Sequence, residues 1–250
     1  MIPGIITVRT SSTRLKNKCL LPFGNESTVI EHVIKRAMFF NIDPIICTST
    51  DPSDDILAEI ANKNQVKIFR GSLNNKLKRW MDCAKYYNLN TFHTVDADDP
   101  FFDGKEMEES MNILELEKLD FVAPSKYSSS GGATVGYSIR ASIIKDALVG
   151  IDEDADTEMM WYLLENLPNI KTNVYRDPNY LVPGMPQFRL TLDFQEDYWL
   201  LNSIARILGN NINTSKVYEL LIKNPDFHLI NQFRNSEWKN AQLAKNPIVK

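Results

Sequence analysis

The sequence of 250 residues contains only three cysteines, Cys19, Cys47 and Cys83. Their number is odd, and their separations lack the paired spacing that metal-binding cysteines show. Two of them stand in apolar surroundings, where a free thiol behaves as a small hydrophobic side chain. We therefore expect a reducing compartment and no zinc site.

Long hydrophobic runs are also missing. No stretch approaches the roughly 18 uninterrupted apolar residues that a membrane-spanning helix needs. Residues 1–4 lead directly into an apolar segment, without the charged leader and apolar core of a signal peptide. These absences predict a soluble, cytoplasmic protein without a membrane partner.

Charge of one sign is not concentrated anywhere along the chain. The 28 basic and 32 acidic residues are well mixed and leave a net charge of -4, so no basic stripe indicates a nucleic-acid partner. With 43% hydrophobic residues, a chain of this length can bury a full core. We expect one large α/β domain, or one domain with a small appendage.

Short apolar runs alternate with longer segments of helical spacing through the first half of the chain. The predicted strands are 4–8, 45–48, 66–69, 92–95 and 121–123, and the predicted helices are 29–40, 54–64, 76–87 and 105–116. Asp51-Pro52 is typical of a helix start, with the aspartate as N-cap. This alternation predicts a mostly parallel sheet with helices on both faces.

The second half continues with shorter elements. After a Ser- and Gly-rich turn at 128–132, its pattern predicts strands at 135–140 and 170–175, helices at 141–148 and 158–166, and a loop at 177–186. A further strand is predicted at 188–193, followed by a helix at 196–208. Residues 237–250 are polar and predict a helix with a frayed end.

The loop after the first predicted strand, residues 9–18, is rich in Ser and Thr and carries the cations Arg9, Arg14 and Lys18. Its small side chains let backbone N–H groups approach phosphate oxygens, and Arg14 and Lys18 can neutralise the phosphate charge. In parallel sheets, ligands bind beyond the carboxyl ends of the strands. The loop therefore predicts a nucleoside triphosphate site, with a solvated loop carrying incidental cations as the alternative.

Two carboxylates stand at or just beyond the ends of predicted strands. Asp98 follows the strand at 92–95, and Asp193 ends the strand at 188–193. Magnesium commonly takes one or two carboxylates, with phosphates and water completing its ligands. This pair predicts a Mg²⁺ site. The alternatives are a turn role for Asp98 and a helix N-cap for Asp193, and Asp193 taken alone is more typical of the cap.

A second polar segment, residues 69–72, reads Phe-Arg-Gly-Ser and also follows a predicted strand. It predicts contacts to a base or ribose, or else a structural turn before the helix at 76–87. None of the three histidines has a Ser or Cys companion arranged as nucleophile and base. The sequence therefore argues against a histidine-led covalent mechanism.

Taken together, these segments resemble the CMP-sugar synthetase group of cytidylyltransferases, nearest to the spore-coat polysaccharide branch and more distantly CMP-Kdo and CMP-sialate synthetases. The group's loop pattern A-R-x-G-S-T-R-L-P-x-K matches residues 8–18, and its F-R-G-S pattern matches residues 69–72. Its G-D-x-P-L-I and L-D-T-P-E-D-L patterns match residues 97–102 and 192–198. The resemblance covers most of the chain.

This resemblance implies a Rossmann-like nucleotidyltransferase fold, as in nucleotide-diphospho-sugar transferases. It implies one domain over residues 1–250, a homodimer, and an acceptor-side and dimerisation segment at 127–186. Arg14, Lys18 and Asp98 are then catalytic, and Asp98 and Asp193 hold Mg²⁺. The implied nucleotide-binding residues are Val8, Arg9, Thr10, Ser11, Ser12, Arg14, Lys18, Arg70, Ser72 and Asp96.

The chain departs from the group's patterns at two places. Ser11 and Ala97 replace glycines, and we expect the loss of glycine's freedom to cost about 1 kcal/mol and to weaken nucleotide binding. On the acceptor side, residues 132–136 lack both carboxylates of the pattern G-L-D-V-E, and residues 158–161 lack the histidine of E-H-V-T. The nucleotide class is therefore better defined than the acceptor.

The leading hypothesis is a Mg²⁺-dependent cytidylyltransferase that transfers CMP from CTP to an anionic acceptor such as a sugar acid, for a surface glycan, and releases pyrophosphate. A polyol phosphate or phosphonate acceptor is an alternative within the same chemistry. A catalytically idle nucleotide-binding homologue is an alternative outside it. A dinucleotide-binding protein is disfavoured, because no G-x-G-x-x-G follows the first strand.

Overall fold

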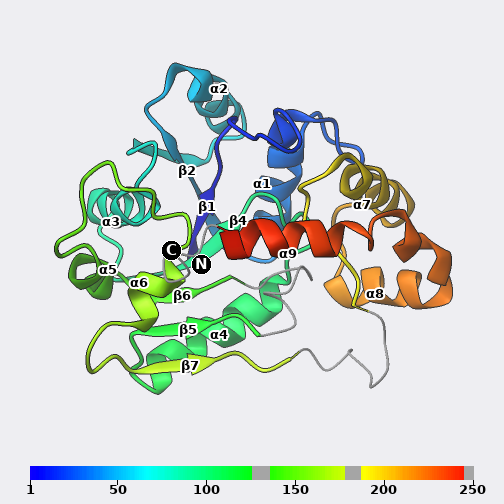
Figure 1. Cartoon of the computed structure of the whole chain (residues 1–250). Coiled ribbons are helices and arrows are strands. Elements are labelled where there is room, and N and C mark those ends of the chain that lie inside the picture. Colours follow the sequence, from blue (N-terminus) through cyan, green and yellow to red (C-terminus); the bar gives the residue numbers. More distant parts are fainter. Residues whose placement is uncertain (126–135, 178–186, 245–250) are drawn as a thin grey trace.

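The computed structural model describes residues 1–125, 136–177 and 187–244, and it contains a seven-stranded sheet in the order β3-β2-β1-β4-β6-β5-β7 (Figure 1). Strands β3, β2, β1 and β4 are parallel, whereas β6 runs antiparallel to both β4 and β5, and β7 is parallel to β5. The predicted mostly parallel sheet is confirmed. The strands are β1 (Ile2–Thr7), β2 (Ile42–Ser49), β3 (Lys67–Gly71), β4 (Thr91–Asp96), β5 (Phe121–Ala123), β6 (Ser138–Arg140) and β7 (Thr172–Val174).

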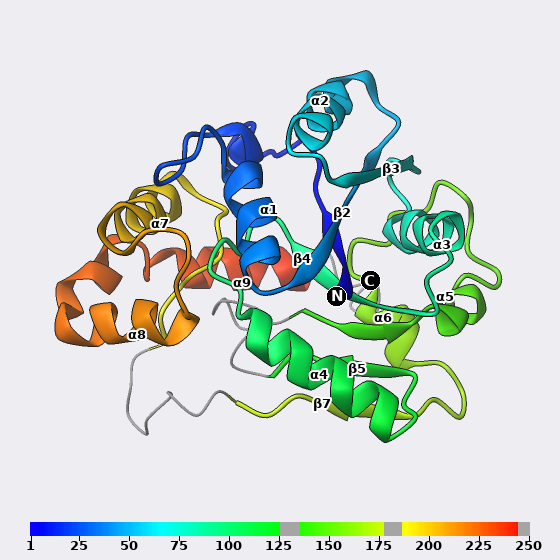
Figure 2. The same ribbon diagram turned by 180° about the vertical axis from the view of Figure 1, so that it is seen from behind.

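Helices cover both faces of the sheet. Successive strand residues point to opposite faces, so Ile6 packs in the core with α1, α2, α4, α7 and α8, while Ile5 packs in the core with α3, α5 and α6. Figures 1 and 2 show α1, α7 and α8 on one side of β1 and β4, and α3, α5 and α6 on the other. The α-helices are α1 (Val29–Phe39), α2 (Asp55–Lys63), α3 (Lys76–Tyr86), α4 (Gly104–Leu116), α5 (Ala141–Ala147), α6 (Trp161–Glu165), α7 (Gln195–Leu208), α8 (Thr214–Lys223) and α9 (Arg234–Ala244), and the 3₁₀ helices are η1 (Lys18–Leu20), η2 (Pro52–Asp54) and η4 (Pro225–Ile230).

Polar side chains start the helices that follow β-strand ends. The Asp51 carboxylate accepts from Ser53 N, as predicted for Asp51-Pro52. Asn75 caps α3, and Asp103 caps α4. Each cap satisfies a backbone N–H that the first helical turn leaves without a partner. These caps define where the loops at the carboxyl edge of the sheet end.

The prediction of a strand at 188–193 is wrong. The segment belongs to no strand, and β6 occupies the position beside β4 and runs antiparallel to it. The segment instead crosses the loop that follows β4, where Leu192 N donates to Asp98 O over 2.7 Å. Odd- and even-numbered residues along 188–193 are all buried, so the alternation of apolar residues does not mark one buried face of a strand.

The C-terminal region differs from the sequence expectation in extent. Helix α8 was not predicted, although Val217, Tyr218 and Leu221 have helical spacing and are buried. Helix α9 begins at Arg234, before the predicted start at 237, and residues 245–250 lie outside the described residues. The predicted helix at 158–166 shortens to α6. Within the described residues, no helix has the length and apolarity required to span a membrane.

Candidate active site

The carboxyl ends of β1 and β4 lie side by side, because Thr7 pairs with Asp96 in the sheet. The loop that carries the predicted cations leaves β1 there, and the loop with Asp98 leaves β4 at the same edge. Parallel strand ends are the usual place for ligands in such sheets. The two loops therefore meet, as the sequence predicted.

Lys18 joins the two predicted metal carboxylates. Its Nζ donates to Asp98 Oδ2 over 2.8 Å and to Asp193 Oδ1 over 2.9 Å, although these residues lie 80 and 175 positions away in the sequence. It also donates to Leu192 O over 2.8 Å. Lys18 opens η1 directly after Asn17, whose φ of 53° places it in the left-handed region that asparagine tolerates. This turn aims the ammonium at the carboxylates.

Asp193 is nearly buried, with 3% of its side chain exposed, and it faces several cations. Arg14 Nη2 lies 2.7 Å from Oδ1, and Arg189 Nη2 lies 3.6 Å from Oδ2. Burial alone would raise the pKa of Asp193, but Lys18 and Arg14 outweigh it and lower the pKa to about 2. The N-cap interpretation of Asp193 is wrong, because the Asp197 carboxylate accepts from the backbone N–H groups of Asp193 and Phe194.

The loop after β4 crowds carboxylates together. Burial and neighbouring carboxylates raise the pKa of Asp98 in spite of Lys18, and they raise that of Asp99 well above its usual range. Burial would lower the pKa of Lys18, but Asp98 and Asp193 reverse that effect and raise it. Such a cluster favours cations, and its hard oxygen donors suit Mg²⁺. No group of three or more His, Cys, Asp or Glu within the described residues is placed to hold a metal.

The first residues of the cation loop are tied to the rest of the protein. Val8 and Thr10 are buried, and both Thr10 N and Thr10 Oγ1 donate to Asp54 Oδ1 over 2.8 Å. Arg9 Nη1 donates to Leu73 O, and this contact joins the loop to the segment after β3. Ser11 is exposed and Ser12 half-buried. The loop is thus anchored at its base and open to solvent further along.

The expected strain at the replaced glycines is absent. Neither Ser11 nor Ala97 is among the described residues with positive φ, so neither position requires glycine's conformational freedom. On the acceptor side, Gly136 has a φ of +80°, and a Cβ there would lie 2.1 Å from Thr94 O. The backbone therefore excludes a carboxylate at 136. Residues 132–135 lie outside the described residues.

Arg70 and Ser72 hold loops at the same edge of the sheet. Arg70 donates to the carbonyl oxygens of Ser49 and Asp51 and pairs with Asp55 over 2.7 Å. Ser72 Oγ accepts from Asn75 N at the start of α3. These contacts correspond to the structural-turn alternative, and contact with a nucleotide stays a prediction.

Sequence reasoning missed three residues. Asp54 is buried and anchors Thr10, and Arg189 is fully buried beside Asp193. Lys76, at the start of α3, pairs with the predicted residue Asp96 over 3.2 Å and lies 4.9 Å from the centre of the Trp80 ring. The position of Lys76 at a helix start was only a weak indication that it belongs to the site. None of the three residues lies in a local motif.

His32 positions the carboxylate loop from α1. Its Nε2 lies 2.7 Å from Pro100 O, and the ring makes edge contacts with Phe23 and Phe101. Burial lowers its pKa to about 4, below the ordinary value near 6.5. Neutral His32 therefore contributes stability that is complete above about pH 6.5 and is lost as the pH falls towards 4.

We expect the wild-type protein to lose about 3 kcal/mol more unfolding free energy between pH 7 and 4 than a His32→Gln variant loses. Urea unfolding at each pH measures this difference. His228→Gln, at a half-buried histidine on η4, is the control for removal of an imidazole, and it should lose the same unfolding free energy between pH 7 and 4 as the wild type. Parallel curves for wild type and His32→Gln would exclude His32 as the source of the acid sensitivity.

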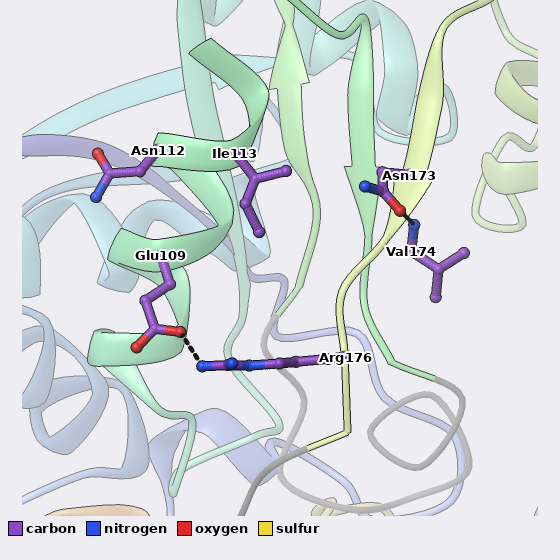
Figure 3. Close-up of a pocket in the computed structure, with 6 residues that line it drawn as sticks. All are labelled: Glu109, Asn112, Ile113, Asn173, Val174 and Arg176. Atoms are coloured by element: carbon purple, nitrogen blue, oxygen red, sulfur yellow. Dashed lines mark hydrogen bonds and ion pairs between the residues drawn. The ribbon is translucent and has the colours of Figure 1, made fainter. Parts of the chain in front are cut away.

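An open pocket of about 400 Å³ lies away from this site, between α4 and the edge strand β7 (Figure 3). Glu109 points across it to Arg176, and the two pair over 2.8 Å. None of the predicted site residues lines this pocket. Three of its lining residues, Asn173, Val174 and Arg176, belong to the segment 127–186, whereas the two loops with the predicted site residues meet at the strand ends of β1 and β4.

Comparison with known proteins identifies the family. The sequence profile described as Cytidylyltransferase matches residues 4–147, which include the cation loop, β3 and Asp98. The chain belongs to the cytidylyltransferase family. This cytidylyltransferase is 27% identical over 234 residues to the spore coat polysaccharide biosynthesis protein SpsF of Bacillus subtilis, with 89% of this chain and 94% of SpsF covered. The resemblance drawn from its motifs is confirmed.

Solved structures agree with this assignment. A cytidylyltransferase from Leptospira borgpetersenii superposes with a TM-score of 0.76 and 26% identity over 90% of this chain and 95% of its own. A CMP-2-keto-3-deoxy-manno-octonic acid synthetase solved with CTP shares the fold, with a TM-score of 0.54 and 14% identity over 69% of this chain and 88% of its own. The Rossmann-like nucleotidyltransferase fold is confirmed, and the protein is a nucleotidyltransferase.

Proposed function

We propose that this cytidylyltransferase transfers CMP from CTP to a small anionic acceptor and releases pyrophosphate, with Mg²⁺ bound by Asp98 and Asp193. The convergence of Arg14 and Lys18 on these two carboxylates carries the proposal. Cations that bind phosphate and carboxylates that bind a metal then share one site.

The reaction needs positioning and charge stabilisation more than a covalent nucleophile. Arg14 and Lys18 bind the β- and γ-phosphates, while Arg9, Ser11 and Ser12 surround the nucleotide. Val8 and Thr10, whose backbone N–H groups donate to Cys47 O and Asp54, line the base of this loop. Arg70, Ser72 and Asp96 complete this pocket from the neighbouring strand ends. When bound, Mg²⁺ offsets the charge that develops on the phosphates and on the leaving pyrophosphate.

For the acceptor we propose a sugar acid that enters a surface glycan. The relative SpsF is named as a spore coat polysaccharide biosynthesis protein, and this supports the choice. The segment 127–186 serves the acceptor and a homodimer within a single cytoplasmic domain.

Addition of CTP with Mg²⁺ should raise the melting temperature by about 5–10 °C at a concentration near 100 times Kd, because only the folded protein binds the ligand. UTP, ATP and GTP should give smaller shifts, and omission of Mg²⁺ should reduce the CTP shift. Differential scanning fluorimetry measures all eight conditions. A Lys16→Gln variant, at an exposed lysine of the same loop, should respond like wild type. No shift with any nucleotide would contradict the proposed function.

The acceptor class is tested by pyrophosphate release from CTP and Mg²⁺ with a panel of sugar acids, polyol phosphates and phosphonates. Release with sugar acids supports the proposal, and release only with polyol phosphates or phosphonates selects the alternative acceptor. Binding of CTP without turnover for any acceptor would indicate an idle homologue.

A further inference from the structure

The Lys18 ammonium has no hydrogen left for another acceptor. An ammonium carries three N–H donors, and Nζ directs contacts of 2.8–2.9 Å to Asp98, Asp193 and Leu192 O. Contact with a phosphate therefore requires Lys18 to give up at least one of these acceptors. The nucleotide and the carboxylates compete for the same ammonium.

A divalent cation would compete for the same carboxylates. The proposed metal ligands are Asp98 and Asp193, and Lys18 already bridges one oxygen of each. Arg14 shares Oδ1 of Asp193 with Lys18. An oxygen that accepts charged N–H groups has less electron density for a metal, and two cations at one carboxylate pair repel each other.

The carboxylates around Asp193 are already paired with cations before a ligand arrives. The cations Arg14, Lys18 and Arg189 contact a set of three carboxylates, which are Asp98, Asp193 and Asp197. Each of these three carboxylates is therefore paired with a cation, as Asp96 is with Lys76, and this pairing weakens the attraction of Asp98 and Asp193 for a dication. A triphosphate brings several negative charges, so it attracts both the metal and the two cations of the loop.

We propose that Lys18 keeps divalent metal off Asp98 and Asp193 until a nucleoside triphosphate draws its ammonium away. This inference rests on the proposed function for the identity of the nucleotide. Backbone bonds from Leu20 N to Asn17 O and from Leu21 N to Lys18 O fix η1, and 17% of the Lys18 side chain is exposed. The exchange is thus a side-chain rotation that needs no refolding of the loop. Metal binding depends on nucleotide binding as a consequence.

The test measures Mn²⁺ binding by electron paramagnetic resonance in wild type, Lys18→Gln and Lys16→Gln without nucleotide. We expect Lys18→Gln to bind Mn²⁺ about tenfold or more tightly than wild type. Lys16→Gln removes the same charge from an exposed position and should match wild type. Adding Asp98→Asn to Lys18→Gln should abolish the gain. Lys18→Met, which also lacks the ammonium, provides a second comparison if the glutamine variant folds poorly.

In wild type, saturating CTP should tighten Mn²⁺ binding by a similar factor. Equal Mn²⁺ affinity in wild type and in the folded Lys18 variants would overturn the proposal, as would a gain that survives Asp98→Asn. Isothermal titration of wild type with CTP is a separate readout. Failure to bind CTP would overturn the proposed function, whereas the nucleotide-free comparison would still decide whether Lys18 excludes the metal.

Discussion

Replacement of Asp98 by asparagine should lower the rate of pyrophosphate release from CTP by at least about 100-fold, because a metal ion supplies several kcal/mol of charge stabilisation. The Asp98 side chain is 32% exposed, so its ion pair with Lys18 is only partly buried and the loss of its charge should leave the fold intact. An assay that couples pyrophosphate release to phosphate detection measures activity, and circular dichroism checks folding.

Asp193→Asn should lose activity to the same extent and should also lose stability. Only 3% of the Asp193 side chain is exposed, and the fully buried Arg189 and the mostly buried Lys18 would lose a shared carboxylate. Asp154→Asn, at an exposed aspartate, is the charge-matched control and should behave like wild type. Near-normal activity in either site variant would remove that residue from the proposed metal site.

The Asp197→Asn substitution should lower the free energy of unfolding by about 3–5 kcal/mol, because the buried Arg189 guanidinium loses its two close carboxylate contacts and is left with Asp193 Oδ2, 3.6 Å away. Arg189 Nε and Nη2 donate to the two Asp197 oxygens over 2.8 and 2.9 Å, and neither side chain is exposed. Asp197 also accepts from Asp193 N over 2.9 Å, so activity should fall as Asp193 shifts. Urea unfolding and pyrophosphate release measure the two effects.

A double-mutant cycle separates this buried pair from simple packing. Arg189→Met combined with Asp197→Leu should be less destabilised than Asp197→Leu alone, because no uncompensated guanidinium charge stays buried. Glu219→Gln, which disrupts exposed ion pairs on α8, should leave the unfolding midpoint unchanged. If Asp197→Asn unfolds at the wild-type urea concentration, Arg189 and Asp197 do not stabilise the fold as a charge pair.

The elements were predictable where their patterns are local. Apolar runs and helical spacing located β1–β5 and α1–α4 within a few residues, because each periodic face packs against one side of the sheet. The segment 188–193 was not predicted correctly. Its pattern matches a strand, but its residues are buried on all sides against other parts of the chain. Residues such as Asp54 and Arg189 have no local signature, and only their distant partners reveal them.

The sequence by itself determined the α/β alternation and the positions of the cation loop and the carboxylates at the ends of strands. These features can be recognised because each depends only on a short local stretch of residues. Tertiary structure alone decided that Lys18 bridges Asp98 and Asp193 and that Asp197, not Asp193, serves the start of α7. These contacts join residues up to 175 positions apart, and such distances are closed by the packing of the whole sheet and its helices. Local periodicity carries no information about them.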